Sequence, residues 1–469
     1  MKKNITTLLF LLILVAGSCK ISKEAPKETA ALPNHFRNQL DEDTASIADL
    51  PWNEFFTDTI LQRLVTAAIE KNYDMQIALS NIEAAQLLFS QVRFNYLPQA
   101  SLQISANSSR PSDNSLNGLS LNEFLGSSHI EDYTAAVNVS WEADIWGKIK
   151  NQQKAALAGY LQTREARKAV QTQIVSSTTK GFYNLMMLDA QLVIARKNVV
   201  LNDSTLQIIR LQFNAGQVSS LAVQQAQAQQ QLAARLIPQF EQGIHIQENA
   251  LKILAGELPG PIDRYLTFDQ LTLPAKLTSG VPAGIVSRRP DVKSRELALL
   301  TAAANIGITK ANMYPALRIT ASGGINSIMA SNWFNIPASL FGIVGGSVIQ
   351  PVFQQKRLRT QYEVAQVEQQ RAVAEFRKSV LNAVGETSDA LVRIEKLKVQ
   401  EDIALLRTQN LNLATRNARM LFQNGMANYL EVITAQGNVL ESELALTSIK
   451  RDRFHAVTDL YTALGGGWK

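Results

Sequence analysis

The sequence contains a single cysteine, Cys19, in 469 residues. A lone cysteine cannot form an internal disulfide, so the fold must hold without such cross-links. The chain has four histidines, at positions 35, 129, 245 and 455, and none pairs with another at metal-ligand spacing. It also lacks a P-loop, a dinucleotide-binding fingerprint and a GxSxG motif. We therefore expect no catalytic residues, no metal site and no cofactor, and we do not expect an enzyme.

Long apolar runs are absent beyond the N-terminal residues, so no transmembrane helix is expected in the rest of the chain. The formal net charge is +6, which is too small over this length to suggest a nucleic-acid partner. Hydrophobic residues make up 46% of the chain and charged residues 18%. That composition is typical of a folded protein and not of a disordered one.

The N-terminus reads MKKNITTLLFLLILVAGSCK, a basic start followed by the apolar run Leu8–Ala16 and then small residues. This pattern predicts a signal peptide over 1–18. The ending Ala-Gly-Ser-Cys resembles a bacterial lipobox, in which cleavage leaves Cys19 first and lipidated; the alternative is an ordinary signal with an incidental cysteine. Residues 19–58 are polar and contain three prolines, so we expect a lipid-anchored tether there.

The sequence of one turn occurs twice in the chain. Residues 213–227 read FNAGQVSSLAVQQAQ and residues 422–436 read FQNGMANYLEVITAQ, and six of the fifteen positions are identical. Between them lies the irregular segment 256–284, which holds four of the fourteen prolines. The sequence therefore predicts two similar halves, 59–255 and 285–469, joined by a linker.

Proline is missing from two long windows, between Pro111 and Pro238 and after Pro351. Each window predicts a very long helix, about 100 Å at 1.5 Å per residue, followed by a shorter returning helix. The repeated glycines, Gly216 and Gly425, are placed to end the long helices in a left-handed conformation. Leucines, isoleucines and valines recur at 3-4 spacing, which is typical of coiled-coil packing. The helical hairpins are predicted over 148–254 and 355–464.

Each half also begins with a helix, about 60–95 or 291–313, followed by two strand-like runs. This first helix and the returning helix together roughly match the long one, so they are expected to stack end to end beside it. Apolar and polar residues alternate in the first three runs, which indicates strands with one apolar face and one face in contact with water. The strands are expected at about 100–108, 133–142, 316–326 and 340–350.

Four strands cannot close a barrel, and open sheet edges are not tolerated in lipid. If the strands span a membrane, the barrel must be shared, and two or three copies would supply 8 or 12 strands. The alternative is a soluble sheet on a coiled-coil rod.

The chain resembles the TolC-like outer-membrane factor family, in the lipoprotein branch that serves tripartite efflux systems with RND-type pumps. The resemblance rests on the lipobox, the run Arg288-Arg289-Pro290-Asp291, the Tyr314-Pro315 turn and the paired glycine turns. It implies a mainly α fold with a membrane β part, in which a homotrimer forms a 12-strand barrel in the outer membrane and a periplasmic helical tunnel. It also implies two partners, a periplasmic adaptor and an inner-membrane pump, whose substrate this sequence does not identify.

The same resemblance implies that the glycine turns form periplasmic tips where the adaptor docks, with Gly216, Leu221, Gly425 and Leu430 at the contact. Plain helix ends and coiled-coil core are the alternatives for these residues, as solvated charge is for Arg288 and Arg289. Relatives often carry an aspartate two residues after the second glycine, where this chain has Ala427. The tunnel aperture is therefore expected to use Arg416, Arg419, Asn424, Tyr429 and Glu431 instead. The rival interpretation of the whole chain is a periplasmic coiled-coil adaptor lipoprotein.

The first prediction concerns the anchor. Metabolic labelling with palmitate should mark the wild-type chain and not the Cys19→Ser variant, because no other cysteine can take the lipid. Label retained in the variant would place the anchor elsewhere. The strands, and not the acyl chain, are expected to span the membrane, so insertion should survive the change.

Overall fold

The computed structural model describes residue 36 and residues 46–274, 277–280 and 282–469. The expected signal peptide and Cys19 lie outside the described residues. The helices are η1 (Ile47–Asp49), α2 (Trp52–Phe55), α3 (Thr59–Lys71), α4 (Tyr73–Arg93), η2 (Phe94–Tyr96), α5 (Leu116–Leu125), α6 (Lys148–Asn214), α7 (Ser220–Leu254), η3 (Phe268–Gln270), α8 (Ala283–Arg288), α9 (Pro290–Ala311), η4 (Ala330–Asn332), α10 (Arg357–Gln423) and α11 (Tyr429–Ala463). The strands are β1 (Gln99–Ser109), β2 (Ile130–Glu142), β3 (Ala316–Ser327) and β4 (Leu340–Ile349).

None of the helices in this described part has both the length and the apolar character needed to cross a lipid bilayer. The chain divides into two compact units. The sheet unit comprises Ala84–Leu161 and Leu297–Ala374. The helical unit comprises Gln162–Glu296, Glu375–Lys469 and the described residues of Thr29–Glu83.

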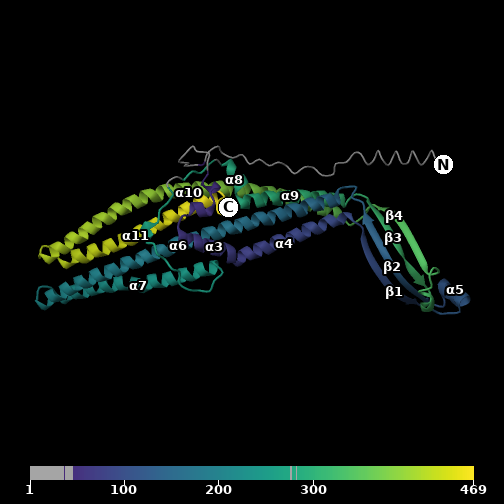
Figure 1. The fold of residues 1–469 in the computed structure, drawn as a ribbon, viewed down its shortest axis with the longest axis horizontal. Helices are drawn as coiled ribbons and strands as arrows, with labels where there is room; N and C mark the ends of the chain where they lie inside the picture. The colour runs from purple at the N-terminus through teal and green to yellow at the C-terminus, as the bar shows by residue number, and fades with distance from the viewer. Residues whose placement is uncertain (1–35, 37–45, 275–276, 281) are drawn as a thin grey trace. The chain divides into compact units, whose positions relative to one another are not determined.

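The sheet unit contains one antiparallel sheet in the order β1-β2-β3-β4 (Figure 1). Strand lengths of 10 to 13 residues are close to the four predicted runs. The order leaves β1 and β4 as edges whose outer backbone groups have no strand partner among the described residues. Those edges are the places where another chain can add to the sheet.

The strand register aligns the apolar positions of β1, β2 and β3 on one face, whereas β4 has apolar side chains on both faces. Leu102 pairs with Val137, Val137 with Gly323, and Gly323 with Gly342. On the same face, β2 carries Tyr133 near one end and Trp141 near the other, eight residues apart, which is about 26 Å of strand at 3.3 Å per residue. On β1, β2 and β3 the opposite face carries mostly polar and small side chains, including Gln103, Asn138 and Ser322, and β4 adds Phe341 and Ile343 to it. The sheet thus has an apolar band between two aromatic side chains.

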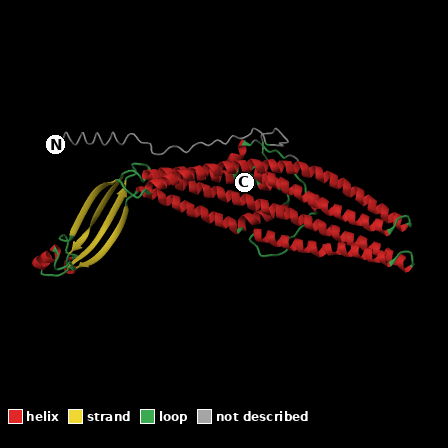
Figure 2. Cartoon of the chain, turned by 180° about the vertical axis from the view of Figure 1, so that it is seen from behind, coloured by secondary structure: helices red, strands yellow, loops and turns green. Residues whose placement is uncertain are grey.

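The two hairpin connections of the sheet lie at the end of the strands opposite to α9 (Figures 1 and 2). The connection between β1 and β2 contains the helix α5, which the sequence analysis did not anticipate. The connection between β3 and β4 is fastened to β2, because the Trp333 ring lies 5.7 Å from that of Tyr133.

In the helical unit, the long helices α6 and α10 each turn back into a 35-residue helix, α7 or α11. Both turns lie at the same end of this unit (Figures 1 and 2). The absence of proline from α6 and α10 allows each of them to continue for 67 residues without a break.

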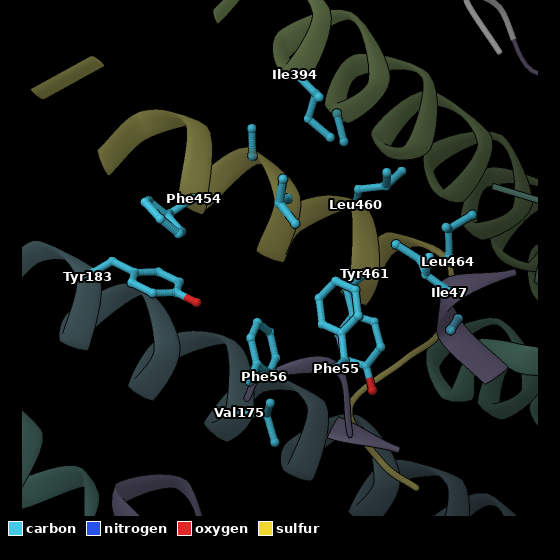
Figure 3. Close-up of a cluster of buried hydrophobic side chains, with 14 of the residues drawn as sticks. Ile47, Phe55, Phe56, Val175, Tyr183, Ile394, Phe454, Leu460, Tyr461 and Leu464 are labelled. Carbon is cyan, nitrogen blue, oxygen red and sulfur yellow. The ribbon is translucent and has the colours of Figure 1, made fainter. Parts of the chain in front are cut away.

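The core of the helical unit gathers aromatic side chains from distant parts of the chain (Figure 3). The Phe55 ring stacks on Tyr461 with ring centroids 4.3 Å apart, and Phe56 meets Tyr461 edge-on. The Tyr461 hydroxyl donates to the Leu50 carbonyl at 2.8 Å. Residues 46–58, which the sequence analysis placed in the tether, therefore belong to this core.

The helix predicted over 60–95 is two helices, because Asn72 ends α3 and caps α4. Its side-chain oxygen accepts from the backbone amides of Asp74 at 2.8 Å and Met75 at 3.3 Å. An asparagine side chain satisfies helix-start amides that have no partner within the helix.

Candidate functional site

The first repeated turn connects α6 to α7 through a left-handed glycine. Gly216 has φ +72°, its amide donates to the Phe213 carbonyl at 2.9 Å, and the Gln217 amide donates to the Gln212 carbonyl at 2.8 Å. This pair of bonds is the Schellman ending of a helix.

The second turn repeats this geometry between α10 and α11. Gly425 has φ +73°, its amide donates to Phe422 at 3.1 Å, and the Met426 amide donates to Leu421 at 2.9 Å. A Cβ built on Gly216 or Gly425 would have no other atom within 4 Å. Glycine is therefore required by the backbone angle and not by crowding, and the surface around both turns is open within the chain.

The two turns start their returning helices differently. Asn428 and Glu431 form a capping box at the start of α11: the Glu431 amide donates to Asn428 Oδ1 at 3.2 Å, and the Asn428 amide donates to Glu431 Oε1 at 3.5 Å. Ser219, at the same place before α7, makes no side-chain cap. Glu431, expected at the aperture, thus holds a helix start together.

Two hydrogen bonds join the hairpins near their tips. The Tyr429 hydroxyl donates to Gln225 Oε1 at 2.8 Å, and Gln436 Nε2 donates to Thr205 Oγ1 at 2.8 Å. Gln436 is fully buried, whereas its counterpart in the first repeat, Gln227, is exposed. Apolar side chains surround these bonds: Leu206, Ile209, Ala222, Ala226, Phe422 and Val432. The sequence analysis did not find this link, although the matched glutamines of the repeat marked one of its members.

The other tip residues named from the sequence lie on the surface of the single chain. Leu221 and Leu430 are exposed, each near the start of its returning helix. Arg416 and Arg419 lie on the last turns of α10 and form no ion pair in the part of the chain that the structure describes. Asn424 Nδ2 donates to the Met420 carbonyl at 2.8 Å.

A second group of residues lies where a returning helix ends and another helix begins; we call this place a joint. At the first joint, Asn72 Nδ2 donates at 3.0 Å to the carbonyl of Leu254, the last residue of α7. Gly256, with φ +67°, lies against the α3 backbone, and a Cβ there would be 2.5 Å from the Lys71 carbonyl oxygen.

The second joint repeats the first with a different side chain. Arg289 Nη1 donates at 3.2 Å to the carbonyl of Ala463, the last residue of α11. Gly465, with φ +94°, lies against the Arg288 backbone, and a Cβ there would be 2.9 Å from the Arg288 carbonyl carbon. Arg289 precedes α9 as Asn72 precedes α4. At the second joint, the guanidinium of Arg289 is therefore the donor to the helix-end carbonyl, as the amide of Asn72 is at the first.

Arg289 is 8% exposed and is bound by two carboxylates. It forms a bidentate pair with Asp291, at 3.0 and 2.7 Å, and a bond of 2.6 Å to Glu386 of α10. Burial alone would lower the pKa of Arg289, but the bonds to these carboxylates outweigh it and the pKa is raised. Burial likewise opposes ionisation of Asp291, yet Arg289 and the α9 backbone amides lower its pKa. Both groups are charged and paired at neutral pH.

The neighbouring residues extend this attachment. Arg288 pairs with Asp49 at 2.8 Å, and its carbonyl accepts from Trp468 Nε1 at 3.3 Å. Pro290 is the first residue of α9, where the missing amide costs nothing. The run 288–291 therefore joins the start of α9 to α10, to the end of α11 and to η1, which gives the sequence motif a structural role.

The described residues contain no group of three or more His, Cys, Asp or Glu side chains arranged to hold a metal ion.

Comparison with known proteins agrees with this arrangement. The family model described as outer membrane efflux protein matches residues 64–257 and 282–466. The chain is 26% identical to the cation efflux system protein CusC of Escherichia coli O6:H1, over 98% of each chain. It is also 26% identical to the probable outer membrane lipoprotein SilC of Salmonella typhimurium, over 97% of each chain. A crystal structure of CusC superposes with a TM-score of 0.82 and 25% identity, covering 96% of this chain and 100% of that one.

The fold, with two helical hairpins and four antiparallel strands in each chain, is that of the TolC-like outer-membrane channels. The chain belongs to the outer membrane efflux protein family. It is the outer-membrane exit duct of a tripartite efflux system, and the rival interpretation as a periplasmic adaptor is not supported.

The Arg289 network gives a pH-dependent prediction. Arg289→Met should lower the free energy of unfolding at neutral pH by about 1–3 kcal/mol, because it removes charge-assisted hydrogen bonds. Since the folded-state pKa of Asp291 is lowered, this stabilisation is complete above the ordinary aspartate pKa of about 3.9 and is lost as pH falls through the lowered value. The difference between wild type and variant should therefore shrink below about pH 4, measured by thermal unfolding in detergent.

Arg288→Met is the matched control. Its partner Asp49 is about half exposed, so the loss should stay within about 1 kcal/mol. Equal losses in the two variants, or a difference that does not change with pH, would contradict the assignment.

Proposed function

We propose that three copies of this chain close one barrel of twelve strands in the outer membrane, with the chain held additionally by a lipid on Cys19. The observation that carries this proposal is the sheet itself: it has four strands, an apolar face that is aligned across β1, β2 and β3, and two free edges. In lipid, every backbone donor and acceptor must be satisfied, so the free edges need further copies of the chain.

The number of copies follows from the need for a conduit. Two copies would give eight strands, and an eight-stranded barrel has an interior that side chains fill. Three copies give twelve strands and a wider interior, lined by the polar face of each sheet. The apolar band would face lipid. Its length of about 26 Å along β2 corresponds to about 20 Å along the membrane normal at a strand tilt of about 40°, which approaches the ~25 Å apolar band of outer-membrane barrels.

The relatives support the remaining partners. Because the family serves tripartite efflux, we propose that the turns at Gly216 and Gly425 form the docking tips for a periplasmic adaptor, which receives substrate from an inner-membrane RND-type pump. Leu221 and Leu430 are exposed beside these turns and are available for the contact. Three chains would present six tips of two kinds. The name of SilC likewise supports the lipid anchor.

Two arginines near the second tip, Arg416 and Arg419, bear on the tunnel aperture. Arg416 and Arg419 lack ion-pair partners among the described residues. Asn424 and Glu431 form hydrogen bonds within the turn, and Tyr429 binds Gln225 of the other hairpin. We therefore assign Arg416 and Arg419 to the aperture wall. Asn424, Tyr429 and Glu431 shape the turn that carries them.

The trimer is tested directly. The unheated protein should migrate on detergent gels as a species three times the mass of the heated one, and native mass analysis should give three chains. A stable monomer in mild detergent would refute the shared barrel, since a four-stranded sheet cannot span a membrane alone.

The docking tips are tested by the double substitution Gly216→Leu with Gly425→Leu. A side chain at positive φ costs roughly 1–2 kcal/mol at each site, which is small beside the packing of a trimer. The bulky side chains would fill the open surface around each turn, so trimer yield should stay normal while adaptor cross-linking and export are lost.

The double alanine variant at the same positions separates strain from bulk. It carries a similar backbone cost with almost no added volume, so it should retain docking. If the leucine variant still cross-links to the adaptor and exports substrate, the turns are only helix ends.

A further inference from the structure

Helix α5 is an apolar element that its own chain leaves uncovered. Leu116, Leu119 and Phe124 project from it and are strongly exposed, Phe124 at 85%. Helix α5 lies beyond the ends of the strands, on the connection between β1 and β2 (Figures 1 and 2). Exposed large apolar side chains gathered on one short helix indicate a contact surface.

The connection between β3 and β4 carries a second exposed apolar group at the same end of the sheet. Phe334 and Ile336 are exposed there, although the loop itself is held in place. Trp333 packs on Tyr133, and within the loop the Ser339 hydroxyl donates to the Asn332 carbonyl at 2.7 Å. This loop is therefore a fixed surface that leaves Phe334 and Ile336 free to meet something else.

The strand order determines which surfaces meet in a closed ring. Copies related by a rotation must pair β4 of one chain with β1 of the next, because those are the two free edges. Helix α5 follows β1, and the Phe334 loop precedes β4, both at the end of the strands opposite to α9 (Figures 1 and 2). Closing the sheet therefore brings α5 of one chain beside the Phe334 loop of its neighbour.

Lipid is the less suitable cover for α5. Tyr133 and Trp333 lie at this end of the apolar band, where aromatic side chains mark the boundary between membrane and water. Helix α5 lies past that boundary, beyond the strand ends (Figures 1 and 2).

We propose that α5 is an interchain clasp: Leu116, Leu119 and Phe124 pack against Phe334 and Ile336 of the neighbouring copy and close the seam of the barrel at its outer end. The clasp rests on the proposed trimer. Along the rest of the seam between β4 and β1, the two chains would be joined by backbone hydrogen bonds between the strands. The clasp adds buried apolar surface to this seam.

Cross-linking between two differently tagged chains tests the clasp. One chain carries Leu119→Cys and the other Phe334→Cys, and a short bismaleimide should join them within the trimer. The native cysteine gives little background, since Cys19 is the only one and is expected to be lipidated. The control pairs Leu119→Cys with Val344→Cys, which is exposed in the middle of β4, and it should not cross-link.

A trimer without the Leu119–Phe334 cross-link, or with equal yield in the control pair, overturns the clasp alone. Absence of a trimer on unheated gels overturns the clasp and the proposed function together. The two failures are therefore distinguishable.

A stability measurement gives an independent test. Phe124→Ser should lower the temperature at which the trimer dissociates by several degrees, whereas Leu258→Ser should not, although Leu258 is equally exposed at 89%. A shift no larger than that of the control refutes the clasp. So does strong quenching, by nitroxide-labelled lipid, of a bimane placed on Phe124→Cys, because that would show that α5 lies in the membrane.

Discussion

The helical unit depends on one constraint: each long helix must be packed along its whole length, although the returning helix beside it is only about half as long. Helices α6 and α10 have 67 residues each, and the returning helices have 35. A second short helix must therefore continue each returning helix, and the joint leaves helix-end carbonyls and amides without partners. Asn72 satisfies both kinds of group at the first joint, and Arg289 satisfies the Ala463 carbonyl at the second. Gly256 and Gly465 let the two backbones approach.

The two joints show how a duplicated chain can keep a geometry while changing its chemistry. An amide is enough at the first joint, where it needs only to bridge Leu254 and the start of α4. At the second joint the guanidinium also reaches Asp291 and Glu386, so it binds a third helix, α10. The motif Arg-Arg-Pro-Asp thus has a structural role: it starts α9, binds the last carbonyl of α11 and pairs its charges with neighbouring carboxylates.

Local rules predicted most of the fold. Missing prolines indicated α6 and α10, glycines indicated the turns, and alternation indicated the strands, because each depends on neighbours within a few residues. Asn428 and Glu431 also form a readable N-x-x-E capping box, and the assignment of Glu431 to the aperture overlooked it. The Tyr429–Gln225 and Gln436–Thr205 bonds join residues more than 200 positions apart, and no local pattern indicates such pairs. Helix α5 escaped notice because its polar and apolar residues follow no clear period.

In the proposed trimer, this chain acts only as part of an assembly. Its sheet has a lipid-type face and a polar face but no enclosed interior, and its tips come in two kinds that differ at the cap before the returning helix. Under the proposed function, a conduit and a ring of docking sites would arise only when the free edges are paired. Ring closure would then set the pore width, the number of tips and the neighbour of each tip at once. A substitution in one chain is repeated around the ring, so a change too small to disturb one fold can still alter every docking site.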